Sequence, residues 1–280
     1  MDAVLIEKLE RIANALERLA PAPTSSAPLT GSDAFMWQGS TALLRPVNKV
    51  QGVDLFLLRG IDRQTRLVLE NTRHFACGHK GNNVMLWGAR GMGKSSLVKA
   101  CFAEVNREHP HALVLIEIQR DDLSTLPRLL DILRAQSRRC IVFCDDLSFE
   151  TQDADYKSLK SVLDGGIMGR PENVLFYATS NRRHLMPRDM TENESGSAIN
   201  PQEAVEEKVS LSDRFGLWIG VHGCNQETYL SIVDGYATHQ NLGISQEALH
   251  RHALEWAMER GGRSGRVAAQ FIDHLSATLG

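Results

Sequence analysis

One stretch of the sequence constrains the fold more than any other. Residues 87–96 read WGARGMGKSS and contain the motif G-x-x-x-x-G-K-[ST] in full. A short apolar run, residues 84–87, precedes the motif, and apolar residues at helical spacing follow it from Ser95 to Glu104. The order of strand, glycine loop and helix predicts a phosphate-binding loop, or P-loop. The competing interpretation is a glycine turn that happens to precede a helix starting with Lys and Ser.

The chemistry of a P-loop assigns a role to each part of this stretch. Glycines let successive backbone N–H groups turn toward a phosphate, and the N-terminus of the following helix adds a partial positive charge. Lys94 is then expected to reach the β- and γ-phosphates of a nucleotide, and the Ser95 hydroxyl to hold Mg²⁺. The predicted nucleotide-binding residues of the loop are Gly88, Ala89, Arg90, Gly91, Met92, Gly93, Lys94, Ser95 and Ser96.

The composition sets the size and the class of the protein. With 280 residues, 42% of them hydrophobic, the chain can form one large α/β domain and a small appendage. Apolar runs are all well short of the roughly 20 residues that span a bilayer, and the N-terminus is not basic, so we expect a cytoplasmic protein without membrane contact. The net charge of −3 gives no global attraction to nucleic acid, which only a local basic face could bind.

The five cysteines and ten histidines suggest no metal centre. None of the cysteines forms a C-x-x-C pair, and their odd number is typical of reduced, buried thiols. The histidines are scattered without a ligand spacing. We therefore expect no structural metal.

The N-terminal residues differ from the rest of the chain. Residues 1–20 carry apolar side chains spaced alternately by four and three residues, which are Leu5, Leu9, Ile12, Leu16 and Leu19. This spacing predicts an amphipathic heptad helix. Residues 21–34 are rich in Pro, Ser and Thr and are expected to form a linker. The helix either mediates self-association or partner binding, or docks on its own domain, and the sequence leaves both possibilities open.

After the linker, predicted strands alternate with predicted helices. Residues 35–60 are expected to be an irregular segment that covers the core, and a helix opens at Ile61. Apolar runs predict five strands, near residues 84–87, 112–118, 139–146, 173–179 and 217–221. This alternation predicts an α/β domain over residues 35–224, with a parallel sheet covered on both faces and functional groups at the carboxyl ends of its strands. Residues 225–280 show three helical stretches and predict a small all-α domain.

Two adjacent carboxylates end the predicted strand 139–146. Asp145, about 50 residues after Lys94, lies where a Walker B carboxylate is expected to accept hydrogen bonds from Ser95 and from the water ligands of Mg²⁺. Asp146 is the candidate for the group that orients or deprotonates the attacking water. Because many P-loop ATPases have the longer glutamate there, turnover is expected to be slow. Glu150 is an alternative base, and two capping aspartates without a catalytic role are the competing interpretation.

Three more polar residues are candidates for contact with phosphate. Asn181 follows the predicted strand 173–179 and can orient water, although Ser180 is an alternative for this contact. Arg214 precedes the last predicted strand and Arg266 starts the last predicted helix. A guanidinium group matches the charge that phosphoryl transfer spreads over the γ-phosphate oxygens. The competing interpretation is that both are surface arginines, which contribute little to stability.

Taken together, these motifs resemble the AAA+ superfamily of P-loop ATPases. The P-loop, the Walker B strand, the strand that ends in ATSN (sensor 1), the arginine-finger box Ser212–Phe215 and Arg266 (sensor 2) follow one another in the AAA+ order. The resemblance covers residues from about 50 to 280. Four segments are similar to a more closely related family of bacterial AAA+ proteins of unknown function: 60–64, 82–94, 143–150 and 210–215.

The resemblance implies a fold and a division of labour. The expected fold is a five-stranded parallel sheet of order 5-1-4-3-2 between helices, with a helical lid domain and with ATP and Mg²⁺ in the cleft between them. Ile61 would contact adenine; in a homo-oligomer, Arg214 would act in trans on the nucleotide of the neighbouring subunit. The residues expected to act on the protein's own nucleotide are Lys94, Asp145, Asp146, Asn181 and Arg266. The Asp-Asp pair departs from the usual Asp-Glu and is shared with initiator and helicase-loader relatives that use ATP as a switch.

Three functions compete at this point. The first is an ATPase whose slow hydrolysis of ATP drives or gates a conformational change in a protein or nucleic-acid partner. The second is an ATP switch or adaptor without turnover that assembles on a partner through the N-terminal helix. The third is a small-molecule kinase on a P-loop scaffold, which the expected arginine finger and sensor 2 disfavour.

Overall fold

The computed structural model describes residues 29–149, 154–164, 169–183 and 214–279, together with Lys8 and Arg11. Apart from those two residues, the predicted heptad helix 1–20 lies outside the described residues. The same holds for residues 21–28 of the linker, for Glu150 and for Ser212 and Asp213. Within the described ranges, no helix combines the length and the apolar character that crossing a membrane requires.

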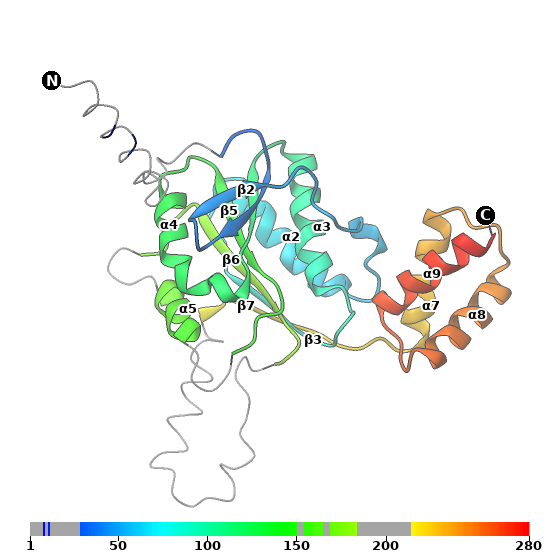
Figure 1. Ribbon diagram of the computed structural model, residues 1–280. Coiled ribbons are helices and arrows are strands. Elements are labelled where there is room, and N and C mark those ends of the chain that lie inside the picture. Colours follow the sequence, from blue (N-terminus) through cyan, green and yellow to red (C-terminus); the bar gives the residue numbers. More distant parts are fainter. Residues whose placement is uncertain are drawn as a thin grey trace, which may run out of the picture.

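A seven-stranded sheet forms the centre of the larger domain (Figure 1). Its order is β2-β1-β4-β5-β6-β3-β7. The β1–β2 pair at one edge is antiparallel, and every other neighbouring pair is parallel. The strands are β1 (Ala34–Gln38), β2 (Leu43–Pro46), β3 (Val84–Gly88), β4 (Leu113–Glu117), β5 (Arg139–Cys144), β6 (Val174–Ser180) and β7 (Leu217–Val221).

The predicted sheet of five parallel strands is therefore wrong in two respects. The sheet has seven strands, and the β1–β2 pair is antiparallel. The five strands seen in the sequence are neighbours, in the order β7-β3-β6-β5-β4. The hairpin β1–β2, formed by residues expected to be irregular, extends the sheet beyond β4. Every residue of β2 is exposed or half-buried, with Leu43 44% exposed, so this edge strand lacks the apolar pattern by which strands are recognised.

Helices cover both faces of the sheet, because successive side chains of a strand point to opposite faces (Figure 1). In β5, Ile141 and Phe143 share a core with α2 (Asp62–Ala76) and α3 (Lys94–Glu108). Cys140, Val142 and Cys144 share the opposite core with α4 (Leu126–Arg134) and α5 (Ala154–Asp164). Two short 3-10 helices, η1 (Leu55–Leu57) and η2 (Arg120–Thr125), complete the domain.

The last three helices form a separate unit beside the sheet domain (Figure 1). This three-helix unit consists of α7 (Gln226–His239), α8 (Gln246–Glu259) and α9 (Gly265–Leu279), which pack around their own apolar core. The side chains of Asn225 and Ser245 accept hydrogen bonds from the first turns of α7 and α8, as helix N-caps do. The fully buried Tyr229 donates its hydroxyl to the Ala253 carbonyl at 3.0 Å and so ties α7 to α8.

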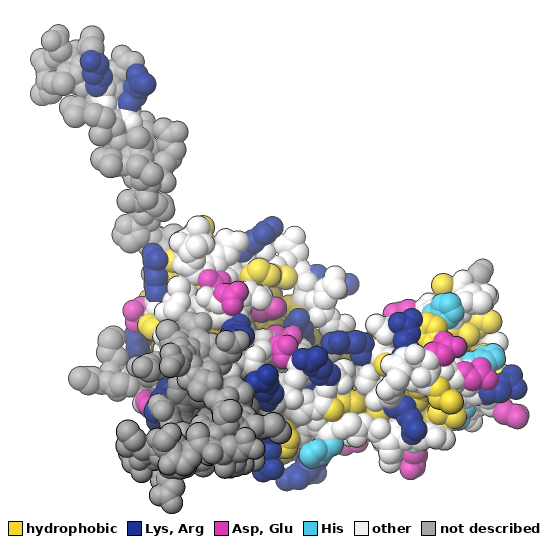
Figure 2. Space-filling view, turned by 60° about the horizontal axis from the view of Figure 1, so that its bottom comes forward, with side chains coloured by type: hydrophobic (Ala, Val, Ile, Leu, Met, Phe, Trp, Pro, Cys, Tyr) yellow, Lys and Arg dark blue, Asp and Glu magenta, His cyan; other side chains and the backbone are white. Residues whose placement is uncertain are grey.

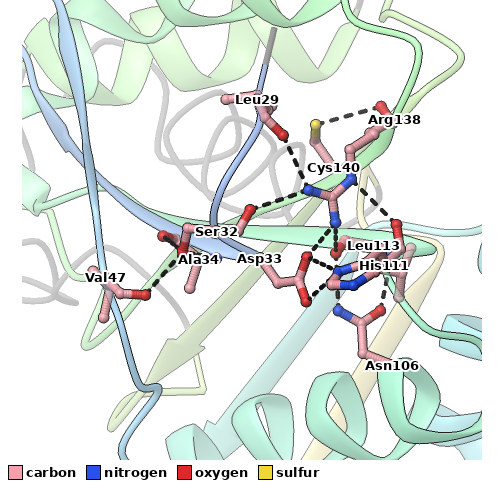
Figure 3. Close-up of polar contacts among 10 residues, drawn as sticks. All are labelled: Leu29, Ser32, Asp33, Ala34, Val47, Asn106, His111, Leu113, Arg138 and Cys140. Atoms are coloured by element: carbon pink, nitrogen blue, oxygen red, sulfur yellow. Dashed lines mark hydrogen bonds and ion pairs between the residues drawn. The ribbon is translucent and has the colours of Figure 1, made fainter.

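The chain enters the sheet domain through an anchor at the amino ends of β1, β4 and β5 (Figure 3). A guanidinium group has five N–H donors, and Arg138 uses all of them here. Its acceptors are the carbonyls of Leu29, Ser32, His111 and Leu113, at 3.0 to 3.2 Å, and the Asp33 carboxylate at 2.5 Å. Residues 29–33, which were expected to belong to the linker, are therefore fixed to the domain, and Leu29 is buried.

Asp33 is the acidic partner in this anchor, and Asp33→Asn should destabilise the fold. Burial alone would raise the pKa of the Asp33 carboxyl, but hydrogen bonds from His111 and Arg138 outweigh it and hold the pKa below the ordinary 3.8. Such a carboxylate stabilises the fold above its unfolded pKa, and the contribution disappears as the pH falls through the lower, folded value. We expect a loss of about 1 kcal/mol near pH 7 in urea unfolding. The difference from wild type should shrink below about pH 4; a constant difference would contradict this account.

Candidate functional site

The phosphate-binding motif forms the loop between β3 and α3. Gly91 and Gly93 have φ angles of 72° and 82°, in the left-handed region that favours glycine. At Gly88, with φ of 129°, a Cβ atom would lie 1.9 Å from the carbonyl oxygen of Val221, so that only glycine fits where β3 meets β7. The loop runs directly into the N-terminus of α3, where the helix dipole favours an anion.

Lys94, the first residue of α3, is bound to the loop that it follows. Its Nζ donates to the carbonyls of Gly88 (3.0 Å) and Ala89 (2.8 Å) and to Oδ1 of Asn181 (3.0 Å). Burial lowers the pKa of the Lys94 ammonium, and the carboxylates of Asp146 and Asp145 act in the opposite direction. The site thus holds a positive charge between a glycine loop and two carboxylates, where it can bind a phosphate.

Asp145, at the carboxyl end of β5, accepts hydrogen bonds from two hydroxyl groups. Ser95 Oγ and Thr179 Oγ1 each donate to its Oδ1 at 2.5 Å. The sequence predicted the contact with Ser95 but gave Thr179 no role. Thr179 stands two residues before Asn181, and side chains two apart along an extended chain share a side, which is the signal that could have identified it. This set of oxygen atoms suits Mg²⁺, which prefers oxygen ligands and keeps some of its waters.

Asp146 and Asn181 lie together next to this group. Asn181 Nδ2 donates to Asp146 Oδ1 at 2.5 Å, while its Oδ1 accepts from Lys94. Asp146 has a φ of 51°, a backbone conformation that Asp tolerates better than most residues. Ser180, the other candidate for sensor 1, is fully buried, and its Oγ accepts from the backbone N–H of Arg182 at 3.1 Å. Asn181 is therefore the residue of the two that reaches Lys94 and Asp146.

A cavity of about 610 Å³ lies at the junction between the sheet domain and the three-helix unit. Its volume is in the range of small-molecule sites. Figure 2 shows several Lys and Arg side chains at this junction. The sheet domain contributes the loop residues Arg90–Ser96, Asp145, Asp146, Thr179 and Asn181, and the three-helix unit contributes Ile232, Tyr236, Gly265, Arg266 and Ala269. The segment before α2 also lines the cavity, with Val53, Leu57, Leu58, Arg59 and Ile61, four of which are apolar.

The start of α9 is bonded directly to the P-loop. The backbone N–H of Arg266 donates to the Gly91 carbonyl at 2.9 Å. A Cβ atom at Gly91 would lie 2.8 Å from Ser264 Oγ, so this glycine also allows the close approach of the two segments. The Arg266 side chain lines the same cavity as Lys94, which places it with the other residues predicted to act on the protein's own nucleotide.

Arg214 lies elsewhere. It precedes β7 by three residues, and Leu217, the first residue of β7, pairs with Val84 at the amino end of β3. The P-loop follows the other end of β3, and five strand residues span about 16 Å. Arg214 therefore does not reach a phosphate bound at its own P-loop. Its Nε and Nη2 donate to the two carboxylate oxygens of Asp164, the Nη2 contact at 3.0 Å.

The fold and the loop together define the class of protein, a P-loop protein with the AAA+ fold. Two variants of Thermotoga maritima RuvB have similar structures, with TM-scores of 0.55 and 0.52 at 16% sequence identity. The matches cover 82% and 78% of this chain, and they span 67% and 62% of the RuvB chains. The Aeropyrum pernix ORC1 protein, solved in complex with DNA, matches with a TM-score of 0.45 at 14% identity, over 81% of this chain and 69% of its own.

The chain belongs to the family DUF815, described as a protein of unknown function, whose sequence model matches residues 30–279. Among curated proteins, none matches this sequence. The predicted membership of the AAA+ superfamily, in a family of unknown function, is confirmed. At 16% identity the solved structures establish a common fold and nothing finer.

Proposed function

We propose that this protein binds ATP with Mg²⁺ in the cavity beside the P-loop, and that it hydrolyses ATP to change the position of the three-helix unit relative to the sheet domain. A macromolecular partner, protein or nucleic acid, would receive this change. One observation carries the proposal: Lys94, the Ser95–Asp145 pair and the Asn181–Asp146 pair converge on a glycine loop whose carbonyl is bonded to α9.

The residues present fit ATP and Mg²⁺. The glycines at positions 88, 91 and 93 have backbone angles that a phosphate-binding loop requires, and the start of α3 favours a negative charge. Lys94 would hold the β- and γ-phosphates, and Ser95 and Asp145 would hold the metal ion. The metal ion would supply positive charge that offsets the negative charge of the phosphate oxygens. Leu58 and Ile61, two apolar residues that line the same cavity, would contact the base.

The remaining residues of the site would orient water and sense the γ-phosphate. Asp146 would be the carboxylate that orients the attacking water, and Asn181 would link it to Lys94 through hydrogen bonds. The presence or absence of the γ-phosphate would then affect both Lys94 and Asp146. Arg266 would contact the protein's own nucleotide, because its side chain lines the cavity and its backbone is bonded to Gly91. The three-helix unit would then act as a lid whose position depends on the nucleotide.

An ATP switch without turnover is the second candidate function. It is supported by the 2.5 Å hydrogen bond that holds the Asp146 carboxylate on the Asn181 amide, and by the shorter reach of aspartate compared with glutamate. As a switch, the protein would move its three-helix unit when the nucleotide binds and when it is released. The partner would promote nucleotide exchange.

Turnover of the wild-type protein separates the two candidates, and Asp146→Asn tests the role of Asp146 in hydrolysis. Because an amide cannot take a proton from water, we expect turnover to fall by roughly 10²-fold while ATP and Mg²⁺ binding stay nearly unchanged. Steady-state phosphate release and titration with a fluorescent ATP analogue measure the two effects. Asp131→Asn, which changes an exposed carboxylate on α4, is the matched control. Unchanged turnover in Asp146→Asn would move the role to Glu150 or another carboxylate. A wild-type protein without turnover, alone or with a partner, would favour the switch.

A further inference from the structure

Thr179, near the carboxyl end of β6, holds three consecutive residues that follow β5. In the sheet, β6 lies between β5 and β3, the strand that leads into the P-loop. The Oγ1 of Thr179 donates to Oδ1 of Asp145 at 2.5 Å and accepts from the backbone N–H of Asp146 at 2.9 Å. The Thr179 carbonyl accepts from the backbone N–H of Leu147, which is fully buried, at 2.7 Å. One residue of β6 thus fixes the segment that carries both carboxylates of the site.

The hydrogen bond to Asp145 determines which oxygen of its carboxylate is available. Three donors share Oδ1: the hydroxyls of Thr179 and Ser95, each at 2.5 Å, and the backbone N–H of Asp146 at 3.1 Å. In the part of the chain that the structure describes, Oδ2 accepts no hydrogen bond, and Asp145 lines the cavity. Groups that bond to a metal-binding carboxylate in this way orient it and so affect the affinity for the metal ion.

The hydrogen bond to Asp146 supports a backbone conformation that residues other than glycine rarely adopt. The φ angle of Asp146 is 51°, in the left-handed region. Such a conformation persists where the surrounding structure holds it. The Asp146 N–H has two acceptors, and Thr179 Oγ1, at 2.9 Å, is nearer than Asp145 Oδ1, at 3.1 Å. In this conformation the Asp146 carboxylate accepts from Nδ2 of Asn181, so Thr179 also supports that contact.

We propose that Thr179 is a positioning residue for both carboxylates of the site. Its hydroxyl group fixes the orientation of the Asp145 carboxylate, which would hold the metal ion, and the backbone of Asp146, which would orient the attacking water. The inference rests on the proposed function for these two roles. Although Thr179 borders the cavity, it is only 1% exposed and donates its hydroxyl proton to Asp145, so it acts through the two carboxylates.

Thr179→Val in the full-length protein tests the inference, because it keeps the branched shape of the side chain and removes only the hydroxyl. We expect the Mg²⁺ concentration for half-maximal binding of a fluorescent ATP analogue to rise by about 10-fold, and kcat to fall by about 10- to 100-fold. The affinity for the analogue in EDTA, which depends on Lys94 and the loop, should stay as in wild type. Asp146→Asn, in contrast, should lower kcat and leave the Mg²⁺ dependence of binding nearly unchanged.

Two further variants at position 179 and one elsewhere complete the experiment. Thr179→Ser keeps the hydroxyl and should regain most of both losses, whereas Thr179→Ala removes it and should behave like Thr179→Val, also where the valine variant does not fold. The control is Thr72→Val on α2. Thr72 is fully buried outside the cavity lining, donates to the Val68 carbonyl at 2.7 Å and lies 2.9 Å from the Tyr177 hydroxyl. This control should lower thermal stability but leave Mg²⁺ dependence and kcat as in wild type.

The outcomes separate this inference from the proposed function. A wild-type Mg²⁺ dependence in Thr179→Val, weakened analogue binding in EDTA, or the same loss in Thr72→Val would each overturn the positioning role while leaving the proposed ATPase intact. If the wild-type protein binds the analogue without turnover, the proposed hydrolysis is wrong, and the Mg²⁺ dependence of binding still decides whether Thr179 orients Asp145. A wild-type protein that does not bind the analogue would overturn both proposals.

Discussion

Lys94→Ala should remove nucleotide binding almost completely. Lys94 brings the only ammonium group to the described part of the cavity, and its Nζ lies within 3.0 Å of three oxygen atoms around the P-loop. Without it, a triphosphate would meet the loop and the carboxylates of Asp145 and Asp146 with much of the compensating charge removed. We expect the dissociation constant for a fluorescent ATP analogue to rise by at least roughly 10²-fold, and turnover to be lost.

A second lysine on the same helix provides the control. Lys99 lies five residues further along α3, where its half-buried side chain makes only a long contact, 3.9 Å from Nζ to Glu117. Lys99→Ala removes the same charge from the same helix and should bind the analogue as wild type does. Circular dichroism of both variants checks that α3 still forms. If Lys94→Ala binds as tightly as wild type, the phosphate site is not at this loop.

Much of the sheet and most of the site could be predicted from the sequence, because both depend on local patterns. Buried parallel strands are continuous apolar runs, and β3 to β7 were found in this way. Functional groups gather at the carboxyl ends of such strands. This is why Ser95 bonds to Asp145, and Asn181 to Lys94 and Asp146, although these residues come from separate segments.

The features that were missed depend on contacts between distant segments. The edge strand β2 is largely exposed and leaves no apolar pattern. Arg138 appears in the sequence as one more basic residue before a strand, and only the folded chain shows five acceptors around its guanidinium group. Asp164 likewise pairs with Arg214, which lies 50 residues away in the sequence. Side-chain pairing across such distances has no signature in a single sequence.

Arg214→Ala should lower turnover by roughly 10³-fold, the scale of a lost arginine finger, while leaving nucleotide binding nearly unchanged. The reason is its place in the sheet. Arg214 lies by the amino end of β7, one strand length from the P-loop of its own chain, so the proposed contact with a γ-phosphate would be made in a neighbouring subunit. Turnover of the wild-type protein should accordingly rise with protein concentration, since it requires assembly.

Complementation tests the trans contact directly. Arg214→Ala has an intact P-loop and Lys94→Ala has an intact finger, so a mixed assembly contains some sites with both. Mixing the two inactive proteins should therefore restore part of the wild-type turnover, with a maximum near equal proportions. Arg45→Ala, which changes an exposed arginine on β2, is the control and should be fully active alone. Full specific activity of Arg214→Ala, under conditions where wild-type turnover depends on concentration, would show that Arg214 takes no part in hydrolysis.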